Sequence, residues 1–529
     1  MGRNAAGESF LRAYLQHNNH LKKYIFFEDS RYLSSFKNAS TKLYSSCDFE
    51  FITNNNIASL SKPGSIFYPG PDISTFAKLR SFSGHNKWGI IGITHTTSSA
   101  GAMDAIVQLF TAPIYSWDAL ICTSNAVKSN VEKLLTYQFS FLKDHLGATK
   151  ISQPNLPVIP LGIHCDDYTF TADEKLISRN SLQINEDEIV VLYLGRLSFH
   201  AKSHPLAMYQ ALEAASKLTA RKIVLIECGW HANDHIKKAF SDAANFACPS
   251  VKVINLDGRA KQNRDLAWAS ADIFCSLSDN IQETFGITPI EAMARGIPLV
   301  VSDWDGYRDS VIDNEQGFLI PTYMPQAGLG SDLAIRHALN IDTYDMYCGY
   351  SSSMVAIDVN KTVHAFAALF NSEELRFKMG KSGINRAKSI YDWSIVIDQY
   401  ESLCSKLDEI RLKSNTKILN NTYPARMDPY EIFSEYPTEI VDLDTIIGMA
   451  DLKIDIAKKR FSDYKNLAMV NYAEYIFPSE KDLDSIFNSL SSSPMKVGEL
   501  IEHFSIKKRP FILRSLCWLI KLNLLKLPR

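Results

Sequence analysis

The feature that most constrains this chain is a repeated alternation of short apolar runs with longer stretches of helical periodicity. Ile189–Leu194, with the sequence IVVLYL, is a continuous apolar run of the kind found in strands that are buried on both faces. Stretches such as 125–142 and 204–218 place their apolar residues at helical spacing. Strand–helix alternation predicts parallel sheets with helices on both faces, so we expect an α/β fold.

The alternation runs through the sequence twice and restarts after Ile159-Pro160-Leu161-Gly162. We therefore predict a Rossmann-like domain over 1–165 and a second, doubly wound domain over 166–413 that ends in helices. Two or three domains also fit the length of 529 residues. The expected strands are 24–27, 65–68, 89–93, 119–122 and 158–161 in the first domain, and 189–194, 222–227, 251–256, 272–277, 298–301 and 317–320 in the second.

A segment rich in Asn, Thr and Ser at 414–426 separates a third part, 425–529, which we expect to be an all-helical accessory module. Its stretch 495–525 resembles the core helices of a winged-helix module. Residues 496–529 hold eight lysines and arginines against two acidic residues. We rank a solvated basic face first, then contact with a protein partner or self-association, then an anionic membrane surface, and nucleic acid last. As a hypothesis, this charge recruits the protein to its acceptor.

Composition narrows the class of protein further. Lys and Arg number 56 against 58 Asp and Glu, a balance that disfavours a protein working mainly on nucleic acid. Nine scattered cysteines without a Cys-x-x-Cys pair predict core residues in a reducing compartment. The chain has no apolar signal core near residue 1 and no uncharged apolar run of membrane-spanning length. We expect a cytoplasmic protein that is at most peripheral to a membrane.

Open α/β sheets bind ligands at the carboxyl ends of their strands, so the loops there are the informative ones. Gly195-Arg196 follows the run 189–194, and Lys202 stands six residues after Arg196. Arginine offers a forked, permanent charge to phosphate, and lysine adds a mobile point charge. The competing interpretation is a pair of solvated loop charges.

The strongest signal is Glu283-Thr-Phe-Gly-Ile-Thr-Pro-Ile-Glu291, which follows the run 272–277. Gly286 allows close backbone approach, and Thr288-Pro289 predicts a helix start. The amides of Phe285–Ile287 would then lie at a positive helix end that suits phosphate. Glu283 and Glu291 could accept hydrogen bonds from sugar hydroxyls. The alternative is one glutamate in a helical first turn and one on the surface.

Two features of the first domain could face the same cleft. His95 follows the run 89–93 and precedes four hydroxyl residues, 96–99. Gly2 and Gly7 predict a glycine-rich turn that leads into a helix over 8–17 and presents amides to an anion. Glu8 occupies the position of the lysine of a nucleotide-binding P-loop, which excludes that class. A strand normally precedes such a turn, so we expect that either the loop is incomplete or the sequence starts late. The competing interpretation is a flexible start before a surface helix.

Other chemistries lack their motifs in this sequence. No group of His, Cys, Asp and Glu has metal-site spacing, so we expect no metal. Gly-x-Ser-x-Gly and Gly-x-Gly-x-x-Gly are both absent. An α/β-hydrolase and a nicotinamide enzyme are therefore disfavoured.

Residues 276–311, SLSDNIQETFGITPIEAMARGIPLVVSDWDGYRDSV, resemble the donor-site signature of retaining family-4 glycosyltransferases with the GT-B fold. The GRL segment at 195–197, Lys202 and the linker VIPLGI resemble the same family. The likeness covers roughly residues 1–410. It implies two Rossmann-like domains facing a cleft, a nucleotide-sugar donor held mainly by the second, an acceptor held mainly by the first, and neither metal nor cofactor.

The resemblance also implies roles for individual residues. Arg196 and Lys202 would bind the donor diphosphate, Glu283 the donor sugar and Glu291 the ribose. His95 would lie beside the reacting sugar. The remaining donor-binding positions would be Gly2, Gly7, Gly195, Phe285, Gly286 and Ile287. The sequence departs from the family in its Arg–Lys spacing of six rather than five, in the missing strand before the glycine turn, and in Asp309, where many members have glutamate.

The expected function is retaining, metal-independent transfer of a sugar to a hydroxyl of a glycan, lipid-linked or protein acceptor, as in polysaccharide biosynthesis. We expect same-face attack, with the leaving phosphate taking the proton, because the motifs supply no evident nucleophilic carboxylate. Three alternatives stay open: a phosphorylase, a sugar-nucleotide epimerase, and a non-catalytic scaffold that binds nucleotide sugars.

Overall fold

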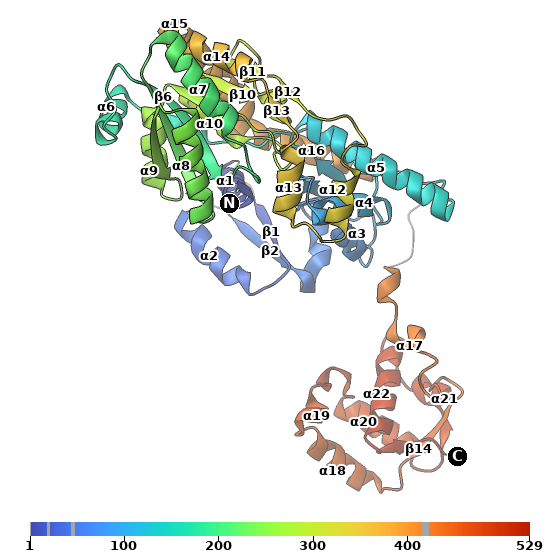
Figure 1. Cartoon of the computed structure of the whole chain (residues 1–529). Coiled ribbons are helices and arrows are strands. Elements are labelled where there is room, and N and C mark those ends of the chain that lie inside the picture. Colours follow the sequence, from blue (N-terminus) through green and yellow to red (C-terminus); the bar gives the residue numbers. More distant parts are fainter. Residues whose placement is uncertain (1, 18–21, 44–47, 415–422, 529) are drawn as a thin grey trace. The chain divides into compact units, whose positions relative to one another are not determined.

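The computed structural model describes residues 2–17, 22–43, 48–414 and 423–528 (Figure 1). The chain divides into two compact units, Met1–Pro424 and Ala425–Arg529. The second unit begins at the residue where the accessory module is predicted to begin. Each unit has its own buried core, so each is described by itself.

The first part of the larger unit is built on parallel strands. β1 (Lys23–Phe27) pairs with β2 (Phe49–Thr53), and β3 (Ser65–Phe67), β4 (Gly89–Ile93) and β5 (Ala119–Ile121) form a second sheet. Four of the five predicted strands are confirmed. The run 158–161 was wrongly predicted as a strand and makes a single bridge, at Val158, because Pro157 and Pro160 remove donors from the ladder. The helices of this part are α2 (Tyr32–Leu43), α3 (Ser74–Arg80), α4 (Ala100–Val107) and α5 (Asn125–Leu146).

Strand β4 delivers the loop that carries His95. Its sequence GIIGI is buried throughout. A Cβ atom on Gly92 would lie 2.6 Å from a side-chain carbon of Ile73 and 2.7 Å from the Gly70 carbonyl, so only glycine allows this close packing. The chain leaves the sheet at Thr94, and Ser99 caps α4 by accepting a hydrogen bond from the amide of Ala102.

The second domain has a six-stranded, fully parallel sheet in the order β11-β10-β9-β6-β7-β8. This confirms the doubly wound prediction. Strand β6 runs to Leu197, so Gly195 and Arg196 lie at the end of the strand, as predicted. The strands are β6 (Ile189–Leu197), β7 (Ile223–His231), β8 (Lys252–Asp257), β9 (Ile273–Ser276), β10 (Leu299–Ser302) and β11 (Gly317–Ile320), and the covering helices include α7 (Leu206–Thr219), α8 (Asp234–Ala247), α9 (Lys261–Ser270) and α10 (Ile287–Arg295).

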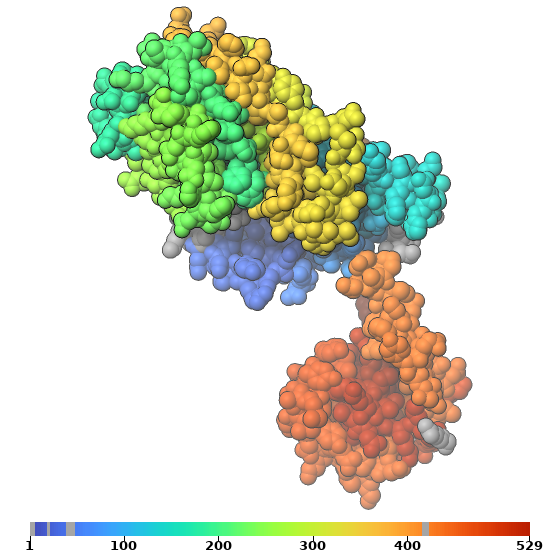
Figure 2. All heavy atoms as spheres, viewed as in Figure 1, coloured from blue at the N-terminus to red at the C-terminus, as the bar shows by residue number. Residues whose placement is uncertain are grey.

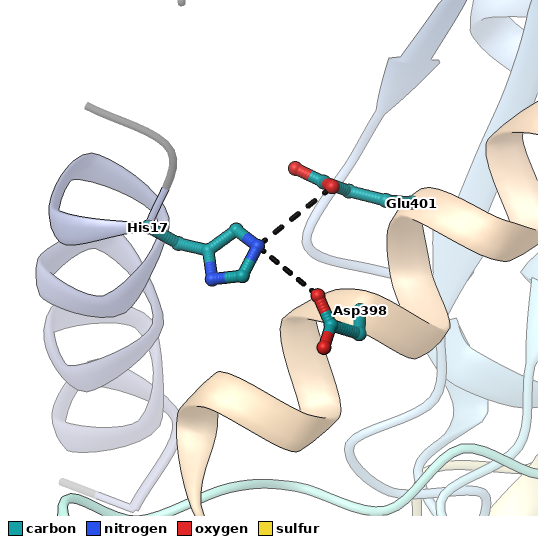
Figure 3. A group of neighbouring side chains, drawn as sticks. All are labelled: His17, Asp398 and Glu401. Atoms are coloured by element: carbon teal, nitrogen blue, oxygen red, sulfur yellow. Dashed lines mark ion pairs between the residues drawn. The ribbon is translucent and has the colours of Figure 1, made fainter. Parts of the chain in front are cut away.

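The chain returns to the first domain through three C-terminal helices of this unit, α14 (Val359–Asn371), α15 (Glu373–Arg386) and α16 (Trp393–Lys413). Helix α16 packs against β4 and against α1 (Gly2–Gln16). The aromatic rings of Phe10 and Trp393 meet edge to face at 5.7 Å between centroids. Beyond the end of α1, His17 Nε2 pairs with Asp398 and Glu401 of α16 (Figure 3).

Helix α1 corrects one prediction. The glycine-rich turn expected at Gly2–Gly7 is wrong, because the helix begins at Gly2 and includes Gly7. A glycine costs a helix about 1 kcal/mol relative to alanine. Burial of Ala6, Ala13 and Leu15 on the inner face of this helix offsets that cost.

The prediction of an all-helical smaller unit is wrong. This unit also contains a three-stranded antiparallel sheet, β15-β14-β16, in which the central strand β14 pairs with both others. The winged-helix likeness stays a prediction. The strands and α-helices are α17 (Pro429–Ile432), β14 (Ile446–Met449), α18 (Ile454–Tyr464), α19 (Ala468–Asn471), α20 (Glu480–Ser489), β15 (Met495–Lys496), α21 (Val497–Glu502), α22 (Arg509–Lys521) and β16 (Leu525–Lys526).

Candidate functional site

The structure brings three of the predicted site residues together at the carboxyl end of β6. An Arg196 Nη2–H donates to Gln282 Oε1 at 2.9 Å and to the carbonyl of Ala201 at 2.5 Å. Lys202 Nζ forms a close ion pair with Glu283. Arg196 thus contacts the residue next to Glu283, and Lys202 contacts Glu283 itself.

A turn between Arg196 and Lys202 accommodates their spacing of six residues. The amides of Lys202 and Ser203 both donate to the carbonyl of Ser198, at 3.0 and 3.2 Å. The extra residue therefore lies within a closed turn, and the ammonium group still reaches the site.

Glu283 is held as a carboxylate. Its side chain is 10% exposed, and burial alone would raise its pKa. The Lys202 ammonium group, together with the backbone amides of Thr284 and Phe285, lowers the pKa below its usual value. An ionised, hydrogen-bond-accepting group is what a ligand's hydroxyls would meet here.

The backbone between Glu283 and α10 is shaped by Gly286. Its φ of +82° lies in the left-handed region, and a Cβ atom there would lie 2.0 Å from the ring of Tyr307. Helix α10 begins at Ile287 and has no side-chain cap, which leaves its first amides available to an anion. Phe285 is buried, so its predicted contribution would come from the backbone alone.

Glu291 lies one turn into α10 and is engaged by the segment that connects the two domains. The hydroxyl of Tyr168 donates to Glu291 Oε1 at 2.6 Å. Burial raises the pKa of Glu291, although Tyr168 and the charge of Arg264 favour the ionised form. The carboxyl group therefore takes part in a hydrogen bond from outside its own helix, and its contact with a sugar stays a prediction.

His95 faces this segment from the first domain. The hydroxyl of Thr284 donates to the carbonyl of His95 at 2.8 Å. The hydroxyl groups of Thr123 and Ser124 donate to the carbonyl of Thr284, at 3.4 and 3.0 Å. The loop after β4 and the start of α5 therefore meet the residue that follows Glu283.

Asp309, which stands where many members of the resembled family have glutamate, takes part in the contact between the two domains. Its two carboxylate oxygens accept hydrogen bonds from the backbone amide and side-chain amide of Asn125, at 2.6 and 3.3 Å. Asn125 is the first residue of α5, so the carboxylate lies at the positive end of that helix.

Sequence reasoning missed four residues that border the site. Gln282 and Tyr344 take part in its hydrogen bonds. Asp305 accepts from Ser124 at 3.2 Å, and burial beside Glu283 raises its pKa to about 8. Asp279 is buried, which raises its pKa to about 7. The only sequence signal for Asp279, Gln282 and Asp305 was their place within the segment 276–311. No feature of the sequence indicated Tyr344.

Gly2 and Gly7 do not form the predicted anion-binding turn, since both lie in α1. Among the residues that the structure describes, one group has the donor atoms and spacing of a metal site, and none of its members is a predicted site residue. His17, Asp398 and Glu401 each offer one ligand atom, with His17 Nε2 at 3.2 Å from Asp398 Oδ1 and 3.7 Å from Glu401 Oε2 (Figure 3). The side chain of Asp398 is 64% exposed, so an ordinary surface ion pair accounts for this geometry.

The two Rossmann-like domains and the cleft-facing loops define a protein with the GT-B fold. Solved structures with this arrangement include Anabaena HepE in complex with UDP, with a TM-score of 0.51 at 14% identity, covering 77% of this chain and 96% of that one. A glycosyltransferase from Rickettsia africae has a TM-score of 0.50 at 12% identity, covering 77% and 95%. At such identities the likeness concerns the fold.

Residues 174–330, which lie within the second domain, match the family of glycosyl transferases group 1. The chain is 29% identical over 153 residues to the phosphatidyl-myo-inositol mannosyltransferase of Mycobacterium leprae, covering 28% of this chain and 31% of the relative. It is 27% identical over 220 residues to the D-inositol 3-phosphate glycosyltransferase of Geodermatophilus obscurus, covering 38% and 44%. The chain thus spans less than half the length of these two relatives. The family resemblance of 276–311 is confirmed.

Helix length and polarity bear on the membrane question. In the described part of the chain, no helix combines the length and the apolar character needed to cross a bilayer.

Proposed function

We propose that this chain is a retaining glycosyltransferase that moves a sugar from a nucleotide-sugar donor to a hydroxyl of a glycan or lipid-linked acceptor, without a metal ion. One observation carries the proposal: Arg196, Lys202, Glu283 and the uncapped start of α10 meet at the carboxyl end of the second sheet. The match of 174–330 to glycosyl transferases group 1 supports the same conclusion.

The proposed chemistry follows the charge that develops during transfer. Cleavage of the glycosyl–phosphate bond places additional negative charge on the departing diphosphate. Arg196, Lys202 and the first amides of α10 would stabilise that charge, because fixed cations and dipoles act most strongly on what forms in the transition state. Removal of one such contact typically costs about 10²–10³ in rate.

The two glutamates would orient the donor. Glu283, with its lowered pKa, is an acceptor for hydroxyls of the transferred sugar. Glu291 would hold the ribose hydroxyls, and the hydroxyl of Tyr168 donates to its carboxyl group. His95 and its loop would receive the acceptor hydroxyl, and same-face attack would let the leaving phosphate take the proton.

The relatives suggest which compounds to try first. HepE was solved with UDP, and the two curated relatives are named for phosphatidyl-myo-inositol and inositol 3-phosphate. We therefore propose UDP-sugars as first donors. Inositol phosphates belong among the first acceptors, and an isolated lipid-linked glycan serves as the contrasting acceptor class.

The test combines binding and turnover. Thermal unfolding is followed against a panel of nucleotide sugars, since a donor at 100 times its dissociation constant adds about 2.7 kcal/mol of stability. Release of free nucleoside diphosphate and transfer to acceptor are then measured for the preferred donor. We expect Arg196→Ala and Glu283→Ala each to lower transfer by about 10²-fold or more, with little change in thermal unfolding.

Arg259→Ala provides a matched control, because Arg259 is exposed and pairs only with nearby Asp257 among its described contacts. This variant should keep wild-type turnover. Full activity of Arg196→Ala would remove the site assignment. Donor binding without any diphosphate release would instead identify a non-catalytic sugar-nucleotide-binding protein.

A further inference from the structure

The connection between β11 and α14 is an excursion with its own closed base. β12 (Thr322–Tyr323) pairs antiparallel with β13 (Ala356–Ile357), and the amide of Asp358 donates to the carbonyl of Pro321 at 3.0 Å. Residues 324–355 therefore leave and re-enter the domain at one point. We call this segment the cleft lobe; it contains α12 (Ser331–Ala338) and α13 (Tyr344–Ser352).

The cleft lobe is held together internally. Arg336 makes two hydrogen bonds of 2.8 Å to the carboxylate of Asp342, and the rings of His337 and Tyr347 stack at 4.3 Å between centroids. Thr343 caps α13 by accepting from the amide of Met346. These contacts place Tyr344, the first residue of α13, in a defined position.

Tyr344 crosses to the first domain. Its hydroxyl lies 2.9 Å from Ser98 Oγ and 3.3 Å from Thr96 Oγ1, both within hydrogen-bonding distance. These two residues belong to the loop that begins at His95. In Figure 2 the yellow surface of the cleft lobe adjoins the blue and cyan surface of the first domain.

On the donor side, burial raises the pKa of Tyr344, and Gln282 is among the polar side chains near its hydroxyl that lower this pKa. The side-chain oxygen of Gln282 accepts from Arg196 at 2.9 Å. Tyr344 thus bonds to the loop of His95 and lies near a residue that contacts Arg196 at the proposed diphosphate site.

We propose that Tyr344 is a positioning residue of the transfer reaction, through which the cleft lobe holds the His95 loop against the donor site. The proposal rests on the function proposed above. The hydrogen bonds between this half-buried hydroxyl and those of Ser98 and Thr96 join the two domains and would be lost if the domains separated, so they favour the closed state. Closure of the site excludes water and fixes the acceptor hydroxyl near the donor.

A second contact also holds the His95 loop, so loss of the Tyr344 hydroxyl should have a limited effect on the position of this loop. Thr284 bonds to the carbonyl of His95 from another direction, at 2.8 Å. The loop is therefore held at two points. Removing the tyrosine hydroxyl should loosen it without unfolding the domain.

The first experiment is kinetic and uses Tyr344→Phe in the full chain. We expect kcat for transfer to fall about tenfold to a hundredfold, because small misplacement of reacting groups has large effects on rate. The KM of the donor should stay within about twofold, since the donor-binding residues remain. The share of donor lost to water should rise relative to transfer.

Tyr347→Phe is the matched control, because it removes a hydroxyl from the same helix. Tyr347 stacks on His337 and has no hydrogen bond from its hydroxyl among the residues described. This variant should keep wild-type kcat. Equal effects of the two substitutions would overturn the proposal.

The second experiment does not depend on turnover. Hydrogen–deuterium exchange of the peptide over 94–103 should be about fivefold faster in Tyr344→Phe than in wild type, as for the loss of one hydrogen bond. Ser98→Ala should have a similar effect, and the double variant should be little worse than either single one, because both remove the same bond.

The outcomes separate the two proposals. Unchanged exchange overturns the role of Tyr344, and faster exchange with unchanged kcat shows a contact that is only structural and overturns it as well. A wild-type protein without transfer activity defeats the proposed function. In that case faster exchange alone still supports the hold of the cleft lobe on the His95 loop.

Discussion

Gly286 shows how one residue can satisfy a backbone and a binding requirement together. Its positive φ lets the chain turn sharply into α10, and its missing side chain leaves room for the ring of Tyr307. The hydroxyl of Tyr307 is in turn bonded to Ser276 at 2.8 Å. Both functions of the glycine were foreseeable in outline from its place between a strand and a helix, but Tyr307 as its neighbour was not.

We expect Gly286→Ala to destabilise the larger unit by at least about 1–3 kcal/mol, the usual cost of a strained backbone conformation, with the clash against Tyr307 adding to it. Denaturant unfolding of the full chain measures this. Gly101→Ala is the control, because a Cβ atom at Gly101 in α4 meets no atom within 4 Å. That variant should be neutral or stabilised by up to about 1 kcal/mol. Equal stability of the two variants would contradict the expectation.

At the scale of elements, the predicted site residues came together because they stand at the ends of neighbouring strands. Arg196 closes β6, and Glu283 follows β9, which pairs with β6. Parallel pairing aligns carboxyl ends at one edge, so strand order alone places these residues close together. The glycine-rich turn predicted at Gly2–Gly7 is instead part of helix α1, because packing, rather than local propensity, decides whether a glycine-containing segment becomes helical.

Glu227, a buried acidic residue of β7 that contacts α7, predicts how the stability of the larger unit depends on pH. The hydroxyl of Tyr209 donates to Glu227 Oε1 at 2.5 Å, and burial raises the pKa of Glu227 to about 7. A raised pKa means that the folded state binds the proton more tightly than the unfolded state. Its contribution to stability is therefore full below pH 4.5 and is lost as the pH rises through about 7.

We expect Glu227→Gln to remove this loss, because glutamine keeps an acceptor for Tyr209 and does not ionise. Relative to wild type, the variant should gain up to about 3 kcal/mol of stability between pH 5 and pH 8. Chemical denaturation at both pH values measures the difference. Glu213→Gln is the comparison, since the pKa of Glu213 is lowered and its substitution should shift the pH dependence in the opposite direction. Parallel pH profiles for wild type and Glu227→Gln would contradict this assignment.

At the scale of the whole molecule, the excess of basic residues over 496–529 is balanced by acidic residues elsewhere in the smaller unit. Ala425–Arg529 contains fifteen basic and fifteen acidic residues, so the unit carries no net charge. Among the described residues, four of the basic side chains form ion pairs within it: Lys458 with Asp484, Lys496 with Asp444, Lys508 with Asp482, and Lys526 with Asp451. The balance favours the interpretation ranked first, a solvated face, over an anionic membrane.

Removal of residues 425–529 should leave the larger unit folded, because the two units have separate cores. We expect its thermal midpoint to change by no more than about 2 °C. The proposed transfer to a small water-soluble acceptor should continue at a wild-type rate. Sedimentation with phosphatidylserine vesicles should be the same for the full and shortened chains. Binding to those vesicles by the full chain alone would restore recruitment as the role of this unit.

The order of residues by itself determined the α/β class, the two-domain division and the segment around Glu283, because buried parallel strands and glycine-containing strand ends have strong local signatures. Only the tertiary structure decided that Tyr344 reaches Ser98 and that Tyr168 reaches Glu291. Contacts of that kind depend on how distant segments pack, and a tyrosine in a helix has no local signal that names its partner.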